Sequence, residues 1–163
     1  MTTFSKAILF LTLVTVSLLA GRAFWAGVVD DPANFPAATY VAYFQGVDRA
    51  IERPIATMGI AALLLTGIAT ALSFRDRPVF YILLAAFGCV VVSTFVTVHF
   101  HLPINHQIAG FNPASLPTNW PGLRDRWWGF HKVRLVALLA AMNLIFLAVL
   151  MRQAIGKHKT LTA

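Results

Sequence analysis

The side chains best suited to chemistry gather in one stretch of the chain, residues 99–134. This stretch holds four of the five histidines and three of the four tryptophans. Phe130 and His131 lie three and four residues after Trp127, and Arg134 lies four and three residues after them, which places all four on one face of a helix. An imidazole can transfer a proton near neutral pH, and a guanidinium binds anions. One helical face therefore presents aromatic rings, a proton-transfer group and a cation together.

The residues before this face give a weaker signal. Pro103 has no amide hydrogen to offer the carbonyl of His99, so we expect a helix to end or kink there. His99 and His101 are two residues apart and cannot share a face of a regular helix. We interpret His101 and His106 as interfacial histidines in a wet loop. His99 and His131, which lie inside expected helices, are the histidines favoured for function.

The composition indicates that membrane helices position these residues. Of the 163 residues, 58% are hydrophobic and 12% are charged, and the mean hydropathy is +0.73. Several apolar runs reach the length of about 20 residues that crosses a bilayer as a helix. The net charge of +7 would suit nucleic acid in a soluble protein, but the basic residues lie mostly at the ends of apolar runs, as membrane anchors do. We therefore predict no nucleic-acid partner, and the single cysteine, Cys89, excludes an intramolecular disulfide.

We predict an all-α, integral membrane four-helix bundle that forms a single transmembrane domain over residues 1–163. The spans are expected at 7–29, 55–74, 79–100 and 127–151, followed by a basic tail at 152–163. Residues 30–53 are expected to form an amphipathic helix on the bundle or at the interface, and Pro54 to begin the second span. A Pro- and Asn-rich loop, 101–126, is expected between the third and fourth helices. A cleaved signal peptide is an alternative for the first run, because Gly21-Arg22-Ala23 resembles a cleavage site.

With four crossings, the connections 30–53 and 101–126 lie on the same side of the membrane. The polar residues that then converge at one end of the bundle are Arg22, Asp48, Glu52, His99, Asn105, His131 and Arg134. Arg22 and Arg134 lie roughly 10 Å below their helix ends, where a charge facing lipid is expensive. Each should therefore point inward or snorkel to the surface. Basic residues in the short segments on the other side predict that both termini are cytoplasmic, in a bacterial inner membrane.

The end of the third run and the start of the fourth resemble a known family. The resemblance rests on Leu102-Pro103-Ile104-Asn105, on the loop that leads to Arg126-Trp127, and on the WWGFHKVR segment that contains His131 and Arg134. These features look like the family of small four-helix membrane proteins that includes the fungal anthrone oxygenases. The similarity is sharpest over the last third of the chain, and the layout of the spans agrees throughout.

The resemblance implies a cofactor-independent oxygenase that acts on an activated aromatic or polyketide-type small molecule, with dioxygen as co-substrate. His131 would be the base that removes a proton from the substrate carbon. Arg134, Arg22 and Asn105 would stabilise the resulting anion, and the aromatic side chains would bracket a flat ring. The expected catalytic residues are His131, Arg134 and Asn105, and the expected substrate-binding residues are Arg22, Trp25, His99, Trp127 and Phe130.

Two other functions fit the same residues. A metal or haem site could be built at the mouth of the bundle, although no His-x-x-Glu-His or Glu-x-x-His spacing is present. Its ligands would come from His99, His101, His106 and His131. A non-catalytic membrane protein could instead bind a lipid or a protein partner, with the aromatic residues and arginines as interfacial anchors. The expected partners are the lipid bilayer and, for the enzyme, a hydrophobic small molecule; the oligomeric state stays open.

Overall fold

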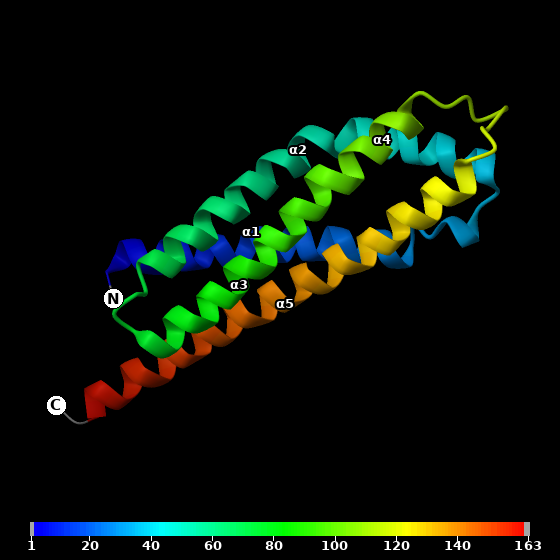
Figure 1. Ribbon diagram of the computed structural model, residues 1–163. Helices are drawn as coiled ribbons and strands as arrows, with labels where there is room; N and C mark the ends of the chain where they lie inside the picture. The colour runs from blue at the N-terminus through cyan, green and yellow to red at the C-terminus, as the bar shows by residue number, and fades with distance from the viewer. Residues whose placement is uncertain (1, 162–163) are drawn as a thin grey trace.

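The computed structural model describes residues 2–161, with side chains as far as Gln153, and it is all-α (Figure 1). The elements are α1 (Thr3–Val28), the 3-10 turn η1 (Pro32–Asn34), α2 (Ala37–Ala71), α3 (Arg77–Val96), the π-helical turn η2 (Thr97–His101), α4 (Leu102–Ala109) and α5 (Trp120–Leu161). Most of the predicted basic tail, 152–163, lies outside the residues whose side chains are described.

Within residues 2–161, four helical stretches are long and apolar enough to cross a membrane, as the sequence predicted. They are Thr3–Asn34, Ala37–Ala71, Arg77–Ala109 and Trp120–Gln153, and each overlaps one of the expected spans. Their outer faces carry large apolar side chains such as Phe10 and Val136, which are mostly exposed. An apolar surface of this extent suits contact with lipid rather than with water.

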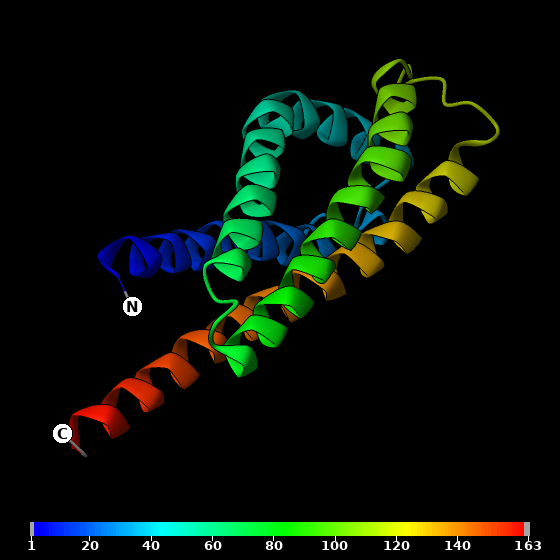
Figure 2. The same cartoon turned by 60° about the vertical axis from the view of Figure 1, so that its left-hand side comes forward.

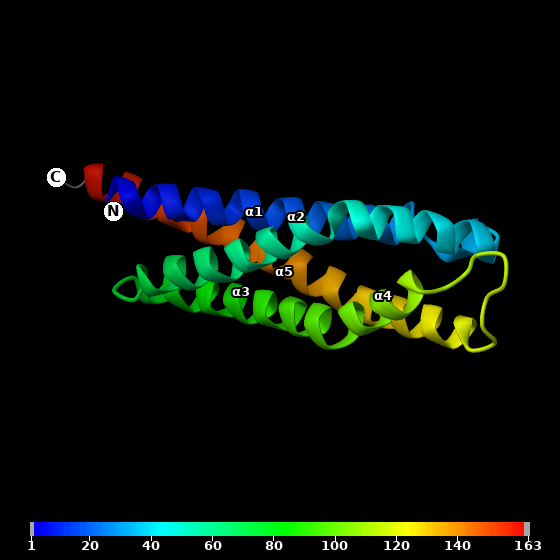
Figure 3. The ribbon, with the colours of Figure 1, turned by 90° about the horizontal axis from the view of Figure 1, so that it is seen from above.

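The four long helices pack around a common core. α1 contacts α2 and α5, and α3 contacts the same two helices. The start of α1 and the end of α5 lie at one end of the molecule, together with the turn between α2 and α3 (Figure 3). The connections that follow α1 and α4 lie at the opposite end. The first and third connections therefore share one end, as the count of crossings requires.

Small side chains allow the helices to approach one another. Ala20, Ala62, Ala86 and Ala141 come from α1, α2, α3 and α5, and all four are fully buried. Such residues let helix backbones pack closely in an apolar medium. Four buried hydroxyl groups, those of Thr12, Thr66, Thr70 and Ser73, donate to the carbonyl four residues earlier, so these hydroxyls are satisfied.

α2 differs from the prediction of a short amphipathic helix followed by a separate span. It is one helix that begins at Ala37 and runs through Pro54 to Ala71. Pro54 lacks the amide hydrogen that would bond Ala50, and its ring crowds that carbonyl, which bends a helix without having to end it. Figure 2 shows a sharp bend within α2. The segment predicted as a separate element is therefore the first arm of a bent helix.

The third helix also continues beyond its predicted end. The chain passes through the π-helical turn η2 into α4, so helix persists to Ala109 and the connection shortens to residues 110–119. In η2 the amide of Leu102 bonds the carbonyl of Thr97, five residues earlier. This shift accommodates Pro103, which could not have donated a hydrogen bond in a regular α-helix. α5 likewise begins at Trp120, seven residues before the predicted span, with Pro121 in its first turn.

Candidate functional site

A cavity of about 300 Å³ lies among the four long helices, toward the end that carries the long connections. Most of its lining is apolar, and its polar side chains come from every helix around it. These are Arg22, Asp30, Tyr40, Tyr43, Asp48, Glu52, Ser93, Thr94, Thr97, His101, Asn105, Trp127 and Arg134. Pockets that bind small molecules have volumes of roughly 300–1,000 Å³ and a few polar groups in an apolar wall. The cavity fits that description at its lower limit.

The cavity gathers half of the residues proposed from the sequence. Arg22, Asn105, Trp127 and Arg134 all line it. The other four lie elsewhere, and His131 among them is fully buried directly behind the lining. Trp25 and His99 are exposed, and His99 stacks on Phe95, while the ring of Phe130 stacks on Phe100. Four of the eight proposed residues, which are far apart in the sequence, therefore line one cavity.

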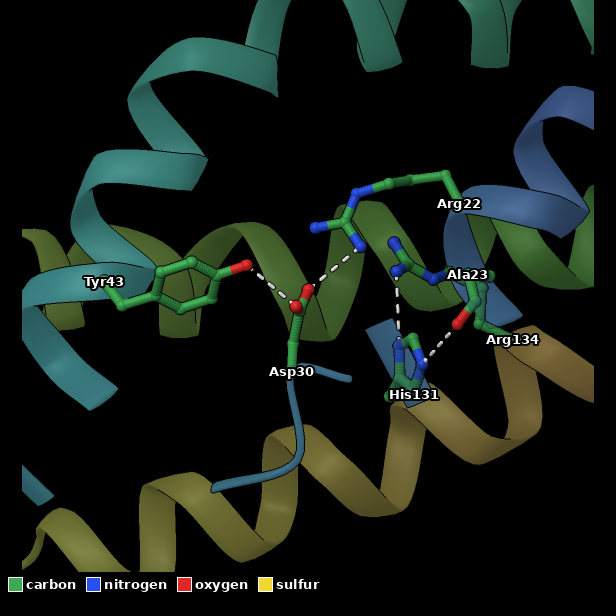
Figure 4. A network of polar contacts seen from close by, with 6 residues as sticks. All are labelled: Arg22, Ala23, Asp30, Tyr43, His131 and Arg134. Carbon is green, nitrogen blue, oxygen red and sulfur yellow. Dashed lines mark hydrogen bonds and ion pairs between the residues drawn. The ribbon is translucent and has the colours of Figure 1, made fainter. Parts of the chain in front are cut away.

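Arg22, Asp30 and Tyr43 form a polar cluster at the cavity wall (Figure 4). An Nη1–Oδ2 distance of 3.1 Å joins Arg22 to Asp30, and the Tyr43 hydroxyl donates to the other carboxylate oxygen at 2.8 Å. The cluster ties the end of α1 to the first arm of α2. Sequence reasoning assigned Asp30 no role, because nothing in its spacing indicates that it turns back toward Arg22.

His131 is held between α1 and its own helix (Figure 4). Its Nε2 lies 3.1 Å from the carbonyl oxygen of Ala23, and its Nδ1 lies 3.3 Å from Nη2 of Arg134. A carbonyl only accepts and a guanidinium only donates, so Nε2 carries the hydrogen and Nδ1 accepts. Both ring nitrogens are therefore engaged, and the imidazole is neutral in this arrangement.

Gly27 allows this close approach of α1 to α5. A Cβ atom at Gly27 would lie 3.6 Å from Nε2 of His131 and 3.4 Å from a methyl carbon of Leu135. Those are ordinary contact distances for one carbon atom, but they leave no room for a longer side chain. The absence of a side chain at Gly27 therefore keeps the His131 ring within reach of Ala23.

Arg134 presents a positive charge to the cavity with no carboxylate beside it. Arg22 pairs with Asp30 and Arg124 pairs with Asp125, but no described carboxylate forms an ion pair with Arg134. Arg134 contacts the neutral ring of His131 instead, and its buried Nε has no hydrogen-bond partner within the described part of the chain. A guanidinium in an apolar wall interacts strongly with an anion that can reach it. This charge is the strongest anion-binding feature of the cavity.

His101 is the feature that the sequence analysis missed. It was assigned to a wet loop, but η2 turns it into the interior, where it is 2% exposed and lines the cavity. Its ring stacks on Trp127, and its Nε2 lies 3.3 Å from the Trp127 carbonyl, so Nε2 carries the hydrogen. Its Nδ1 is buried and has no partner among the described residues. His101 therefore combines a place in the cavity lining with a buried ring nitrogen that has no hydrogen-bond partner among the described residues.

A chain of hydrogen bonds links α5, α4 and α2 beside this histidine. The indole of Trp127 donates to Oδ1 of Asn105 at 2.8 Å, and Nδ2 of Asn105 donates to Asp48 at 2.7 Å. The Trp127 ring also stacks on His101 and on His131, at centroid distances of 4.8 and 5.0 Å. This series of hydrogen bonds fixes the orientation of the Trp127 indole, and the indole packs against both imidazoles.

The four histidines proposed as metal or haem ligands do not converge. His99 and His106 are exposed, whereas His101 and His131 are buried with their ring centroids 6.2 Å apart. Among the described residues, no three His, Cys, Asp or Glu side chains are close enough together to hold a metal ion.

Residues 48–144 match the family model described as Anthrone oxygenase, and the match covers more than half of the chain. No curated protein and no solved structure matches the chain. The matched region includes Asp48, His101, Asn105, Trp127 and Arg134. It does not include the cluster of Arg22, Asp30 and Tyr43.

Proposed function

Because the chain belongs to the anthrone oxygenase family, we propose that it is a membrane-embedded oxygenase for an activated aromatic or polyketide-type small molecule. The observation that carries this proposal is the pairing, in one apolar cavity, of a histidine with a free ring nitrogen and an arginine without a counter-ion. These residues are His101 and Arg134. The four apolar helices support a location within the bilayer.

The proposed reaction needs no external reductant. A base removes a proton from a carbon activated by neighbouring aromatic rings and a carbonyl group, and the electron pair spreads onto the carbonyl oxygen. The carbanion form adds to dioxygen and gives a peroxide, which takes the proton back. The peroxide then loses water, so both hydrogens of the original CH₂ group leave with one oxygen atom. The other oxygen atom remains as a new carbonyl.

His101 is the base in this proposal. A general base needs a free lone pair near the substrate; His101 lines the cavity, and its buried Nδ1 has no hydrogen-bond partner among the described residues. His131, the base proposed from the sequence, has both nitrogens engaged and lies behind the lining. Its contacts support a different role, in which it orients the guanidinium of Arg134.

Arg134 stabilises the anion that forms when the base has taken the proton. A fixed cation in a water-poor site lowers the energy of such an enolate or phenolate. Arg22 lies in the same lining, but Asp30 already neutralises it. Trp127 offers an aromatic wall for a flat ring, and Asn105 holds that wall in place. No cofactor is assigned a role in this scheme.

Oxygen uptake by purified protein in lipid nanodiscs, with anthrone as the probe, tests the proposal. We expect the wild type to consume oxygen and to place one atom of ¹⁸O₂ in the product. His101→Ala should lower turnover by roughly 10²–10⁴-fold, the usual contribution of a general base. His99→Ala is the matched control, because this exposed histidine lies two residues away and outside the cavity lining. Wild-type turnover by His101→Ala would overturn the assignment of the base.

We propose that the protein is a single transmembrane domain of the inner membrane with both termini in the cytoplasm. Arg75 and Arg77 in the short turn between α2 and α3 support this orientation. In a Cys89→Ser background, an impermeant thiol reagent added outside spheroplasts should label Thr118→Cys and spare Arg75→Cys. The reverse pattern would contradict the orientation.

A further inference from the structure

We propose that the substrate enters the cavity sideways from the bilayer, through an opening between the second arm of α2 and the α3–η2 helix. This lateral portal is bordered by Ala56, Gly59 and Ile60 on α2 and by Thr94 and Val98 on the other side. The inference rests on the proposed function and narrows its substrate class. The substrate would be an uncharged, lipid-soluble molecule that carries one polar group.

The portal residues face the cavity and the outside of the molecule at once. All five line the cavity. Ile60 is 62% exposed and Val98 is 48% exposed, Ala56 is exposed as well, and Gly59 is half-buried. Because the same side chains belong to both surfaces, the cavity wall is open or thin at this place.

The course of α2 explains why the wall is thin here. Figure 2 shows α2 and α3 spreading apart from the turn that joins them. The bend associated with Pro54 lies five residues before Gly59. At Gly59 no atom lies within 4 Å of the position that a Cβ atom would take. A bent helix with small residues at its inner edge therefore leaves the opening unfilled.

The portal lies at a depth where lipid chains surround the protein. Gly59 is roughly 20 Å along α2 from the charged turn that follows Leu72, and the hydrocarbon core of a bilayer is about 30 Å thick. The hydroxyl of Thr94 donates to the carbonyl of Val90, and that of Thr97 donates to the carbonyl of Ser93. Both threonine hydroxyls are therefore hydrogen-bonded within the helix, and neither presents an unpaired donor to lipid.

The polarity around the cavity fits a molecule that arrives from the membrane. Toward the end with the long connections, the cluster of Arg22, Asp30 and Tyr43 ties α1 to α2 across the cavity wall. The rim also becomes polar in that direction, since Glu52 lies about 10 Å along α2 from Gly59. A molecule with one polar group could lie at the interface and slide its apolar body through the portal, with the polar group toward Arg134.

Narrowing the portal with one side chain tests the inference. Gly59→Leu should block the opening, and the open space around Gly59 lets the new side chain fit. Gly88→Leu is the matched control, because Gly88 also has open space around it, is exposed on α3, and does not line the cavity. Ala56→Leu, one turn earlier in α2, is a second blocking variant. Size-exclusion profiles of all three identify any variant that fails to fold.

The first readout does not depend on catalysis. A small apolar aryl diazirine dissolved in the vesicle bilayer is photolysed, and adducts on Trp127 and His101 are counted by mass spectrometry. We expect these adducts in the wild type and in Gly88→Leu, with a several-fold loss in Gly59→Leu and Ala56→Leu. Unchanged labelling in folded Gly59→Leu and Ala56→Leu would overturn the lateral portal.

Oxygen uptake with anthrone separates this inference from the proposed function. If the portal variants lower kcat/KM mainly through KM, the portal supplies the active cavity. If the wild type shows portal-dependent labelling but consumes no oxygen, the portal stands and the oxygenase proposal fails. If turnover is normal in every variant and labelling is unchanged, the oxygenase proposal stands and the portal is wrong.

Discussion

The guanidinium of Arg134 donates a hydrogen bond to Nδ1 of His131 across 3.3 Å, within one turn of α5. The ring can accept this bond only while it is neutral, and its Nε2 hydrogen is directed to the carbonyl of Ala23. A neutral residue therefore holds the cation in place without cancelling its charge. The full positive charge of Arg134 remains for a ligand in the cavity.

Replacing His131 should distinguish positioning from proton abstraction. We expect His131→Asn to keep more activity than His131→Leu, because an amide oxygen can accept from Arg134 near the position of Nδ1. The rising limb of the pH–rate profile should survive in His131→Asn if His101 is the base. If the increase in rate with pH is lost in His131→Asn but retained in His101→Ala, His131 is the base and His101 is not.

Removing the charge of Arg134 should impair the chemical step. Loss of one group that stabilises a developing oxyanion lowers kcat by roughly 10²–10³-fold, and we expect a loss of this size for Arg134→Gln. Arg126→Gln is the control, because Arg126 lies on the same helix but is exposed and outside the cavity lining. Single-turnover oxygen uptake measures the effect. Equal rates in both variants would mean that the charge of Arg134 does not assist the reaction.

Breaking the contact between Arg22 and Asp30 should lower stability. Asp30 is 8% exposed, so Asp30→Ala leaves the Arg22 guanidinium partly buried without its counter-ion. We expect a cost of roughly 1–3 kcal/mol and a smaller loss for Tyr43→Phe, which removes only one of the two contacts. The neighbouring Asp31→Ala is the control for loss of a carboxylate that has no ion pair, since it removes only an exposed hydrogen bond from the amide of Ala33. Thermal unfolding in detergent should rank the variants in this order.

Side-chain size at Gly27 should control the His131 position. Gly27→Ala should be tolerated, since a Cβ atom there makes only ordinary contacts, whereas Gly27→Leu should push the His131 ring away from Ala23. We expect Gly27→Leu to lose activity as His131→Leu does. Gly21→Leu is the control, because Gly21 is on the same helix and has open space around it. Similar turnover in the two leucine variants would contradict this role of Gly27.

The family and the four apolar helices could be predicted from the sequence. The length and hydropathy of the apolar runs predicted the four long helices. The Leu102–Asn105 and WWGFHKVR segments carried the family resemblance, which the family match confirms. Counting crossings also placed Arg22 and Arg134 at one end, and both line the cavity. These features depend on the length of the apolar runs, on sequence motifs or on the number of membrane crossings, and all of these can be read from the sequence.

The remaining features depend on local geometry that residue spacing does not show. A π-helical turn rotates the residues after it relative to a regular helix, so the inward position of His101 could not be read from a period of 3.6. Pro54 could end a helix or bend it, and the choice depends on packing. Asp30 returns to Arg22 only because the chain reverses after Val28.

The ion pair between Arg22 and Asp30 also bears on how the protein is made. A lone arginine within a nascent segment is costly when the translocon releases it into lipid, by roughly 2.5–3.5 kcal/mol at the helix centre. Because Asp30 is only eight residues away, the first segment carries its own neutralising charge before any later helix has been synthesised. Arg134 has no such neighbour, so its segment depends on helices that are already in place. Biogenesis should therefore tolerate truncation after η1, which retains Asp30, far better than isolated expression of α5.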